Sequence, residues 1–166
     1  LFIIAIDPLL RWLQAGDNGY KLRTSNTTIP ALAYADDLAV TAGSAHRLRD
    51  QARKIEAFCE WAGLEVNIDC QRKNKTAWTG PAGREHEDGP LTLMGQQVPR
   101  LKASEPYVYL GLHLSLDLNW GKHMVALKHK VKDKVTAIRG MRHSPELVMR
   151  TLEMVVRSMV RYTMPV

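Results

Sequence analysis

The stretch PALAYADDLAVTAG, residues 30–43, places two apolar runs on either side of Asp36 and Asp37. Short apolar runs that flank a polar turn predict a β-hairpin, here with the two carboxylates at its tip. Runs this rich in apolar residues are typical of strands that are buried on both faces. We therefore expect a rigid hairpin that presents two adjacent negative charges.

Helices are expected directly before and after this hairpin. Residues 1–15 are mostly apolar and predict a buried helix that Gly16 ends. Ser44 is a good helix N-cap, and the apolar positions after it return every three or four residues until Gly63. The sequence thus predicts a small antiparallel sheet at 30–43 that packs against two helices.

The rest of the chain changes from strands to helices. Strands and hairpins are expected at 20–22, 64–68, 75–79, 91–94 with 97–101, and 107–115. Helices follow from residue 120, and Ser144 with Pro145 and Glu146 predicts the start of another helix. This change of pattern predicts an α+β fold with two domains, residues 1–115 and 116–166.

Composition excludes several classes of protein. Of the 166 residues, 45% are hydrophobic and 24% are charged, which is near the globular average, so a disordered chain is excluded. No stretch approaches the roughly 18–20 apolar residues of a membrane span, so no membrane partner is expected. Cys59 and Cys70 are too few for a disulfide framework, and we expect reduced thiols.

His123 and His129 are expected on the wet face of a helix.

The positive charge is unevenly distributed along the chain. The formal net charge is +6, but residues 1–100 hold 12 Lys and Arg against 12 Asp and Glu. Residues 101–166 hold 11 Lys and Arg against 5 Asp and Glu, so they carry the whole surplus. Such a concentration of cations indicates a polyanionic partner for the C-terminal part.

Adjacent carboxylates at a hairpin tip fit Mg²⁺, which prefers carboxylate oxygens together with substrate phosphates. In two-metal sites such carboxylates help to activate one oxygen and to stabilise the leaving one. The alternative is an ordinary acidic turn, because Asp is favoured in turns for its local hydrogen bonds. An unrelated metal-dependent hydrolase would need further acidic or histidine ligands, and none has suitable spacing.

Several segments, taken in order, resemble one family of enzymes. AYADDLAV at 33–40 resembles the Y/F-x-D-D motif of reverse transcriptases, with the alanine of the LINE-type, non-LTR retrotransposon branch. The other similar segments are LFIIAIDPLLRW at 1–12, GYKL at 19–22, the capped helix at 44–62, GLEVN at 63–67, NKTAW at 74–78, LTLMGQQVPRL at 91–101 and YVYLGLHLS at 107–115. The resemblance covers nearly the whole chain. It implies a partial polymerase palm, with the YADD hairpin packed on helices, followed by the start of a helical thumb.

The resemblance also implies roles for residues of the acidic hairpin. Asp36 would be a ligand of the catalytic Mg²⁺ or Mn²⁺, and Asp37 would be its less directly coordinating neighbour. Tyr34 would pack beside the acidic tip, near the primer terminus.

Further roles are implied outside this hairpin. Lys75 would approach the incoming triphosphate, but Lys73 competes for the role because IDCQRK at 68–73 lengthens this segment. The implied primer grip consists of Tyr109, Leu110 and Gly111. The expected contacts with nucleic-acid phosphates are Lys122, Lys128, Lys130, Lys132 and Lys134.

The implied function is that of an RNA-directed DNA polymerase. It would extend a DNA primer with dNTPs along an RNA template by two-metal phosphoryl transfer, as a ribonucleoprotein in the nucleus or cytoplasm. The chain would be an internal piece of this longer enzyme. It would be inactive alone, because an upstream catalytic aspartate and the fingers are missing. The alternative is an inactive relic or truncated copy that acts at most as a basic nucleic-acid-binding module.

Overall fold

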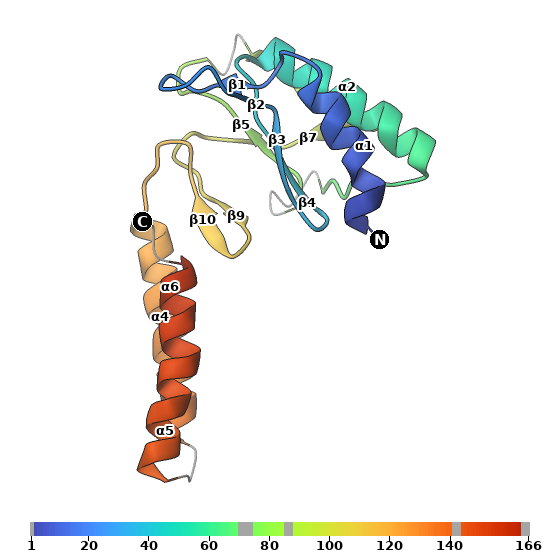
Figure 1. The fold of residues 1–166 in the computed structure, drawn as a ribbon. Coiled ribbons are helices and arrows are strands. Elements are labelled where there is room, and N and C mark those ends of the chain that lie inside the picture. The colour runs from blue at the N-terminus through green and yellow to red at the C-terminus, as the bar shows by residue number, and fades with distance from the viewer. Residues whose placement is uncertain (1, 70–74, 85–87, 141–143, 164–166) are drawn as a thin grey trace. The chain divides into compact units, whose positions relative to one another are not determined.

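The computed structural model describes residues 2–69, 75–84, 88–140 and 144–163 and has a mixed α+β fold, as predicted. The chain divides into two compact units, Leu1–Glu105 and Pro106–Val166, whose elements are labelled in Figure 1. This division lies ten residues before the expected one at 115/116. The strands between 107 and 114 therefore belong with the helices that follow them.

Helices α1 (Phe2–Gln14) and α2 (Ala45–Ala62) lie side by side in the first unit (Figure 1). A side chain of α2 satisfies the C-terminal end of α1, because Lys54 Nζ donates a hydrogen bond to the Trp12 carbonyl oxygen at 3.2 Å. The same ammonium group lies 5.9 Å from the centre of the Trp12 ring. A cation is favourable at this end of α1, where the helix dipole is negative.

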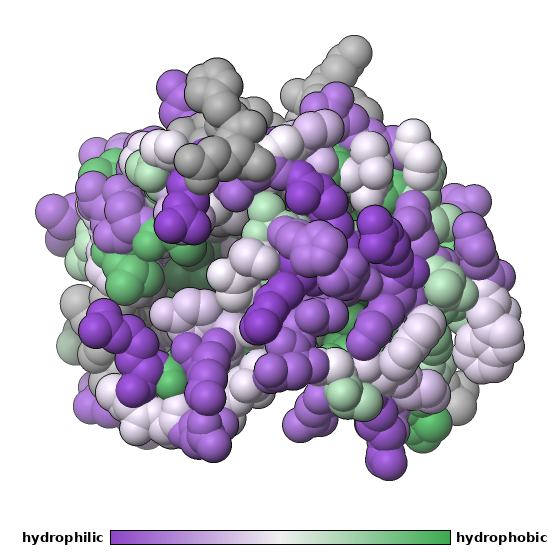
Figure 2. Space-filling view, turned by 90° about the horizontal axis from the view of Figure 1, so that it is seen from above, coloured by the Kyte–Doolittle hydropathy of each residue, from purple (hydrophilic) through white to green (hydrophobic). Residues whose placement is uncertain are grey.

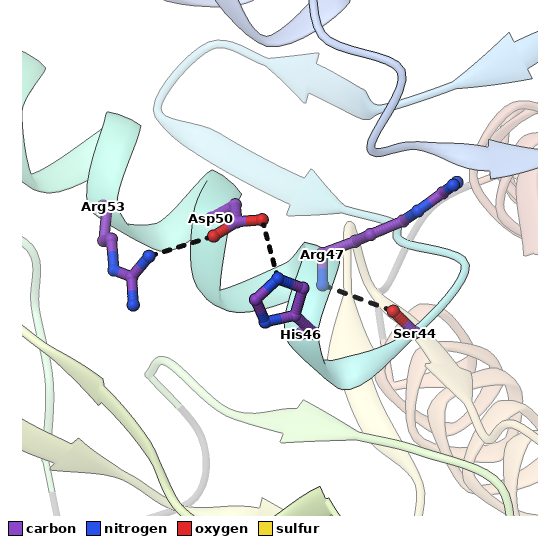
Figure 3. Close-up of polar contacts among 5 residues, drawn as sticks. All are labelled: Ser44, His46, Arg47, Asp50 and Arg53. Carbon is purple, nitrogen blue, oxygen red and sulfur yellow. Dashed lines mark hydrogen bonds and ion pairs between the residues drawn. The ribbon is translucent and has the colours of Figure 1, made fainter.

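The first turns of α2 are fixed by local polar contacts (Figure 3). Ser44 Oγ accepts a hydrogen bond from the Arg47 N–H at 3.3 Å, which confirms the predicted N-cap. Asp50 pairs with Arg53 at 3.0 Å and with His46 at 3.6 Å. The two ion pairs lie within one helix near its surface and add little to stability, whereas the N-cap contributes about 1 kcal/mol.

One cluster of buried apolar side chains joins the two helices to the strands. Its members are Ile6, Leu9, Leu13, Ala52, Ile55, Phe58, Cys59, Trp78, Leu91, Leu93 and Val98. Burial raises the pKa of the Cys59 thiol, so this group acts as a small hydrophobic side chain. Gly63 ends α2 beside the cluster as predicted, with a left-handed φ of 64°.

The strands of the first unit pair two by two. The antiparallel pairs are β1 (Tyr20–Lys21) with β2 (Thr28–Ile29), β3 (Ala31–Tyr34) with β4 (Asp37–Val40) and β6 (Leu91–Leu93) with β7 (Gln96–Val98); the parallel pair is β5 (Trp78–Thr79) with β8 (Arg100–Leu101). The parallel pair is reinforced by Arg100, which lies 2.7 Å from the Asp88 carboxylate and 4.5 Å from the centre of the Trp78 ring.

The structure corrects the expected strand at 64–68 and the expected turn of the second hairpin. Residues 64–68 form no strand. Their alternate side chains Leu64, Val66 and Ile68 pack against the core, but a strand also needs a neighbouring backbone to pair with, and the alternation of apolar residues does not supply one. The second hairpin turns at Met94 and Gly95, one residue earlier than expected, because these two residues adopt positive φ angles of 52° and 71°.

The second unit consists of a β-hairpin and a pair of helical segments. Its elements are β9 (Tyr107–Tyr109), β10 (Leu112–Leu114), α4 (Gly121–Arg139), α5 (Pro145–Leu152), the π-helical turn η1 (Glu153–Arg157) and α6 (Ser158–Thr163). The predicted cap of α5 is confirmed, since Ser144 Oγ accepts a hydrogen bond from the Leu147 N–H. The last three elements run without a break along α4 (Figure 1).

The expected single strand at 107–115 is wrong. The chain reverses at Leu110 and Gly111, whose φ angles are 50° and 83°, so that Tyr109 pairs with Leu112. The tyrosines of β9 therefore share a face with the leucines of β10 with which they pair. Sequence alternation could not reveal this turn, because leucine rarely adopts a positive φ.

Candidate functional site

The acidic pair lies at the tip of the β3–β4 hairpin, as the sequence predicts. Tyr34 and Asp37 form the last residue pair, and Ala35 and Asp36 make the two-residue turn between them. Ala35 has a φ of 51°, and two-residue hairpin turns need a positive φ at this first position. Asp37 shares a face with Tyr34, because directly paired residues point to the same side of a hairpin, whereas Asp36 lies in the turn itself.

The two faces of this hairpin have different surroundings. The inner face packs Ala31, Leu38 and Val40 against the core of the first unit. The outer face carries Leu32 and Tyr34, which are 55% and 66% exposed. The expected burial on both faces is wrong, because this sheet has two strands and no described layer covers its outer side. The tyrosine and the acidic pair are therefore accessible from outside.

The acidic pair is exposed, and neither carboxylate forms an ion pair with another residue that the structure describes. Carboxylate oxygens are the ligands that Mg²⁺ prefers in proteins. Within the described residues, no group of three His, Cys, Asp or Glu side chains is placed to hold a metal ion. Asp36 and Asp37 can thus supply two carboxylates, and a complete metal site would need further ligands besides these two.

Lys75 lies just before β5 and is exposed. Thr76 Oγ1 donates a hydrogen bond to the Asn67 carbonyl oxygen at 2.7 Å. The GLEVN segment and the segment at 75–78 are therefore joined at this point. The competing Lys73 lies outside the described residues.

The tip of the β9–β10 hairpin is attached to α6. The Tyr162 hydroxyl donates a hydrogen bond to the Leu110 carbonyl oxygen at 3.1 Å. Tyr109 and Gly111, the other residues of the expected primer grip, flank Leu110 and are partly buried. Sequence reasoning missed Tyr162, because no local signal connects residues 52 positions apart.

His123 is buried in the second unit, and its expected place on a wet helix face is wrong. It is 2% exposed, its Nε2 lies 2.6 Å from the Thr163 carbonyl oxygen, and its Nδ1 accepts a hydrogen bond from the His113 N–H at 3.3 Å. Together these contacts connect α4 to β10 and to the end of α6. Position 123 lies one turn before the buried Leu127, and this spacing was the signal that could have placed it inside.

The surroundings of His113 and Asp117 shift the pKa values of both side chains. Desolvation, together with His123 and the cationic Lys130, lowers the pKa of His113. Lys130 follows His123 by about two helical turns, so it lies on the side of α4 that faces the β9–β10 hairpin. At the turn before α4, hydrogen bonds from Ser115 and Asn119 lower the pKa of the Asp117 carboxyl.

The expected phosphate contacts are all exposed on α4 but do not share one face; they are Lys122, Lys128, Lys130, Lys132 and Lys134. Lys128 and Lys132 lie one turn apart on one face, and Lys130 and Lys134 lie one turn apart on another. The two pairs are offset by two residues, which is about 200° around the helix. A duplex that lies along one side of α4 can therefore contact one pair and not the other.

The surface carries mainly hydrophilic side chains on the face shown in Figure 2, with hydrophobic ones in separate patches. In the part of the chain that the structure describes, no helix has the length and apolar character needed to cross a membrane. Comparisons with protein families, with curated proteins and with solved structures find no match to this chain.

Proposed function

We propose that this chain is the later palm and the early thumb of an RNA-directed DNA polymerase of the LINE type. The observation that carries the proposal is the acidic hairpin, whose exposed tip holds Asp36 and Asp37 beside Tyr34. Leu38 and Val40 pack the inner face of this hairpin against the core, and this packing holds the tip in place. Two-metal phosphoryl transfer needs carboxylates that are held in place in this way.

The proposed reaction is the attack of a primer 3′ hydroxyl on the α-phosphate of a dNTP that pairs with an RNA template. Asp36 would bind Mg²⁺ or Mn²⁺ with Asp37 beside it, and the bound cation would neutralise charge on the phosphates. Tyr34 shares a face with Asp37 and would pack beside the primer terminus. Lys75 would stabilise the leaving pyrophosphate, and the hydrogen bond from Thr76 supports this choice by joining the two motif segments.

The second unit would hold the primer–template duplex. The hairpin tip at 109–111 is fixed by Tyr162, and a glycine at the tip lets a nucleic-acid backbone approach closely. Lys130 follows His123 by about two turns on the side of α4 that contacts this hairpin, and Lys134 follows one turn later on the same face. Among the lysines of α4, we therefore favour this pair as the phosphate contacts.

Primer extension by the complete protein that contains this chain tests the proposal. Asp36→Ala should lower extension on an RNA template by at least about a hundredfold, because a metal ligand is lost. Asp17→Ala is the matched control, since Asp17 is an exposed acid in the turn after α1 and should leave extension unchanged. Full extension by the Asp36→Ala protein would refute the assignment.

A second candidate is a nucleic-acid-binding module without enzymatic activity. It is favoured by the exposed lysines of α4 and by the charge surplus in residues 101–166. Duplex binding by the chain should then weaken with salt, with a log–log slope of about −0.9 per phosphate contact. Salt-dependent binding in a complete protein that extends no primer would support this candidate. Absent or salt-insensitive binding would remove it.

A further inference from the structure

An open groove of about 460 Å³ lies along α4 and α6 in the second unit. Its floor consists of Leu127, Val131, Val135 and Val160. The three floor residues from α4 are spaced four apart, so they form a single stripe about 12 Å long. The groove therefore offers a linear apolar surface to a partner.

The rim of this groove is positively charged. Lys128, Lys132 and Arg139 line it, and no acidic side chain is among its lining residues. Along the helix axis the two lysines are about 6 Å apart, and the arginine lies about 10 Å beyond them. All three side chains are exposed, and none forms an ion pair with another residue that the structure describes. The rim would therefore attract a negatively charged partner.

We propose that this groove binds an acidic amphipathic helix of a partner protein. An apolar helix stripe fits the floor, as in other complexes in which a helix lies in a groove. Acidic side chains that flank this stripe would meet the cationic rim. Three acids separated by four and then seven residues match the spacing of Lys128, Lys132 and Arg139.

Nucleic acid fits this groove less well. Phosphates need hydrogen-bond donors along their contact, whereas the floor offers aliphatic side chains, and placing polar groups against them is unfavourable. Lys130 and Lys134 point about 200° away from the two rim lysines around α4 and do not line the groove. The two lysine pairs thus divide between two partners, and this inference does not depend on the proposed polymerase activity.

A designed peptide tests the inference on the 166-residue chain. The probe is a fluorescent helical peptide of about 18 residues with leucines along one face and glutamates that flank them at the stated spacing. A second peptide carries lysine in place of every glutamate. We expect the glutamate peptide to bind at least about tenfold more tightly than the lysine peptide, because only its charges complement the rim.

Two double variants separate the groove from the other face of α4. K128E/K132E should weaken binding of the glutamate peptide about tenfold and should strengthen binding of the lysine peptide, a rescue that an unfolded chain could not give. K130E/K134E is the matched control and should change either affinity less than about twofold.

Three results would overturn the inference. The first is no saturable binding of the glutamate peptide at about 100 μM. The second is equal binding of the two peptides by the unmodified chain. The third is displacement of the peptide by duplex DNA whose own binding is lost in K128E/K132E and kept in K130E/K134E, which would make the rim a nucleic-acid contact.

Discussion

Each of the two units is stabilised internally by a different kind of contact. The first unit buries one continuous apolar cluster, at whose centre Leu9 and Leu13 are 1% and 0% exposed. Among the described residues of the second unit, the buried apolar side chains are Leu127 and Ile138, and two polar residues are buried beside them. Of these polar residues, His123 connects the helical segments to the hairpin.

This difference shows how each hairpin is positioned. The acidic hairpin lies on an apolar cluster, whose attraction is strong but has no preferred direction. The β9–β10 hairpin is attached by directional hydrogen bonds from Tyr162 and to His123. Loss of His123 would leave the His113 N–H and the Thr163 carbonyl oxygen without this partner inside the unit, and this costs more than an average contact contributes. The second unit should therefore depend on fewer residues than the first.

The largest expected effect is in the apolar core of the first unit. Leu13→Ala should lower the free energy of unfolding by about 3 kcal/mol, because it leaves a cavity at a fully buried position. Urea denaturation measures the loss, and hydrogen exchange should show it within Leu1–Glu105. Ile3→Ala, at a side chain that is 69% exposed, is the control and should change stability by less than about 0.5 kcal/mol. Equal losses in the two variants would contradict an apolar basis for this unit.

A somewhat smaller effect is expected from the polar centre of the second unit. His123→Phe keeps an aromatic ring but leaves the His113 N–H and the Thr163 carbonyl oxygen without their partner. We expect a loss of about 2 kcal/mol, with faster amide exchange in β10 and α6 and unchanged exchange in the first unit. His129→Phe, on the exposed side of the same helix, should have no measurable effect. A neutral His123→Phe variant would show that packing alone holds the unit.

The smallest expected effect is a pH dependence of the second unit. The pKa of His113 is lowered in the folded state, so the unfolded chain binds the proton more readily. The second unit is therefore at full stability above the ordinary histidine pKa of 6.5, and it loses stability as the pH falls through that value toward the folded pKa. Melting followed from about pH 7.5 to about pH 5 should show this decline, and His113→Gln should reduce it. A stability that rises over the same descent would contradict the assignment.

Local signals allowed the helix ends to be predicted, whereas strand pairing depended on distant residues. Ser44, Gly63 and Ser144 mark helix ends through contacts within a few residues, and each lies where it was expected. The pairing of β5 with β8 joins segments more than twenty residues apart, and no short pattern encodes it. The turn at Leu110 also escaped prediction, since it places a leucine where glycine or asparagine is favoured.

In the candidate site, too, the local structure was predictable from the sequence, whereas the surroundings of the hairpin were not. The acidic hairpin follows from two apolar runs around Asp36 and Asp37, so its tip could be placed from the sequence. The exposure of its outer face could not, because it depends on the absence of a third described strand in this sheet. The division of the α4 lysines could have been read from their spacing, since Lys128 and Lys130 must point in different directions on any α-helix.

The π-helical turn η1 determines how α6 is oriented about the axis of the last helical run. Such a turn holds about one residue more than an α-helical turn, so Glu153–Arg157 accommodates an extra residue between α5 and α6. A regular α-helix through the same residues would rotate α6 by about 100° relative to α5. Val160, Tyr162 and Thr163 would then leave the groove, the hairpin tip and the buried histidine together. The wider turn therefore determines which side chains of α6 face α4 and the hairpin.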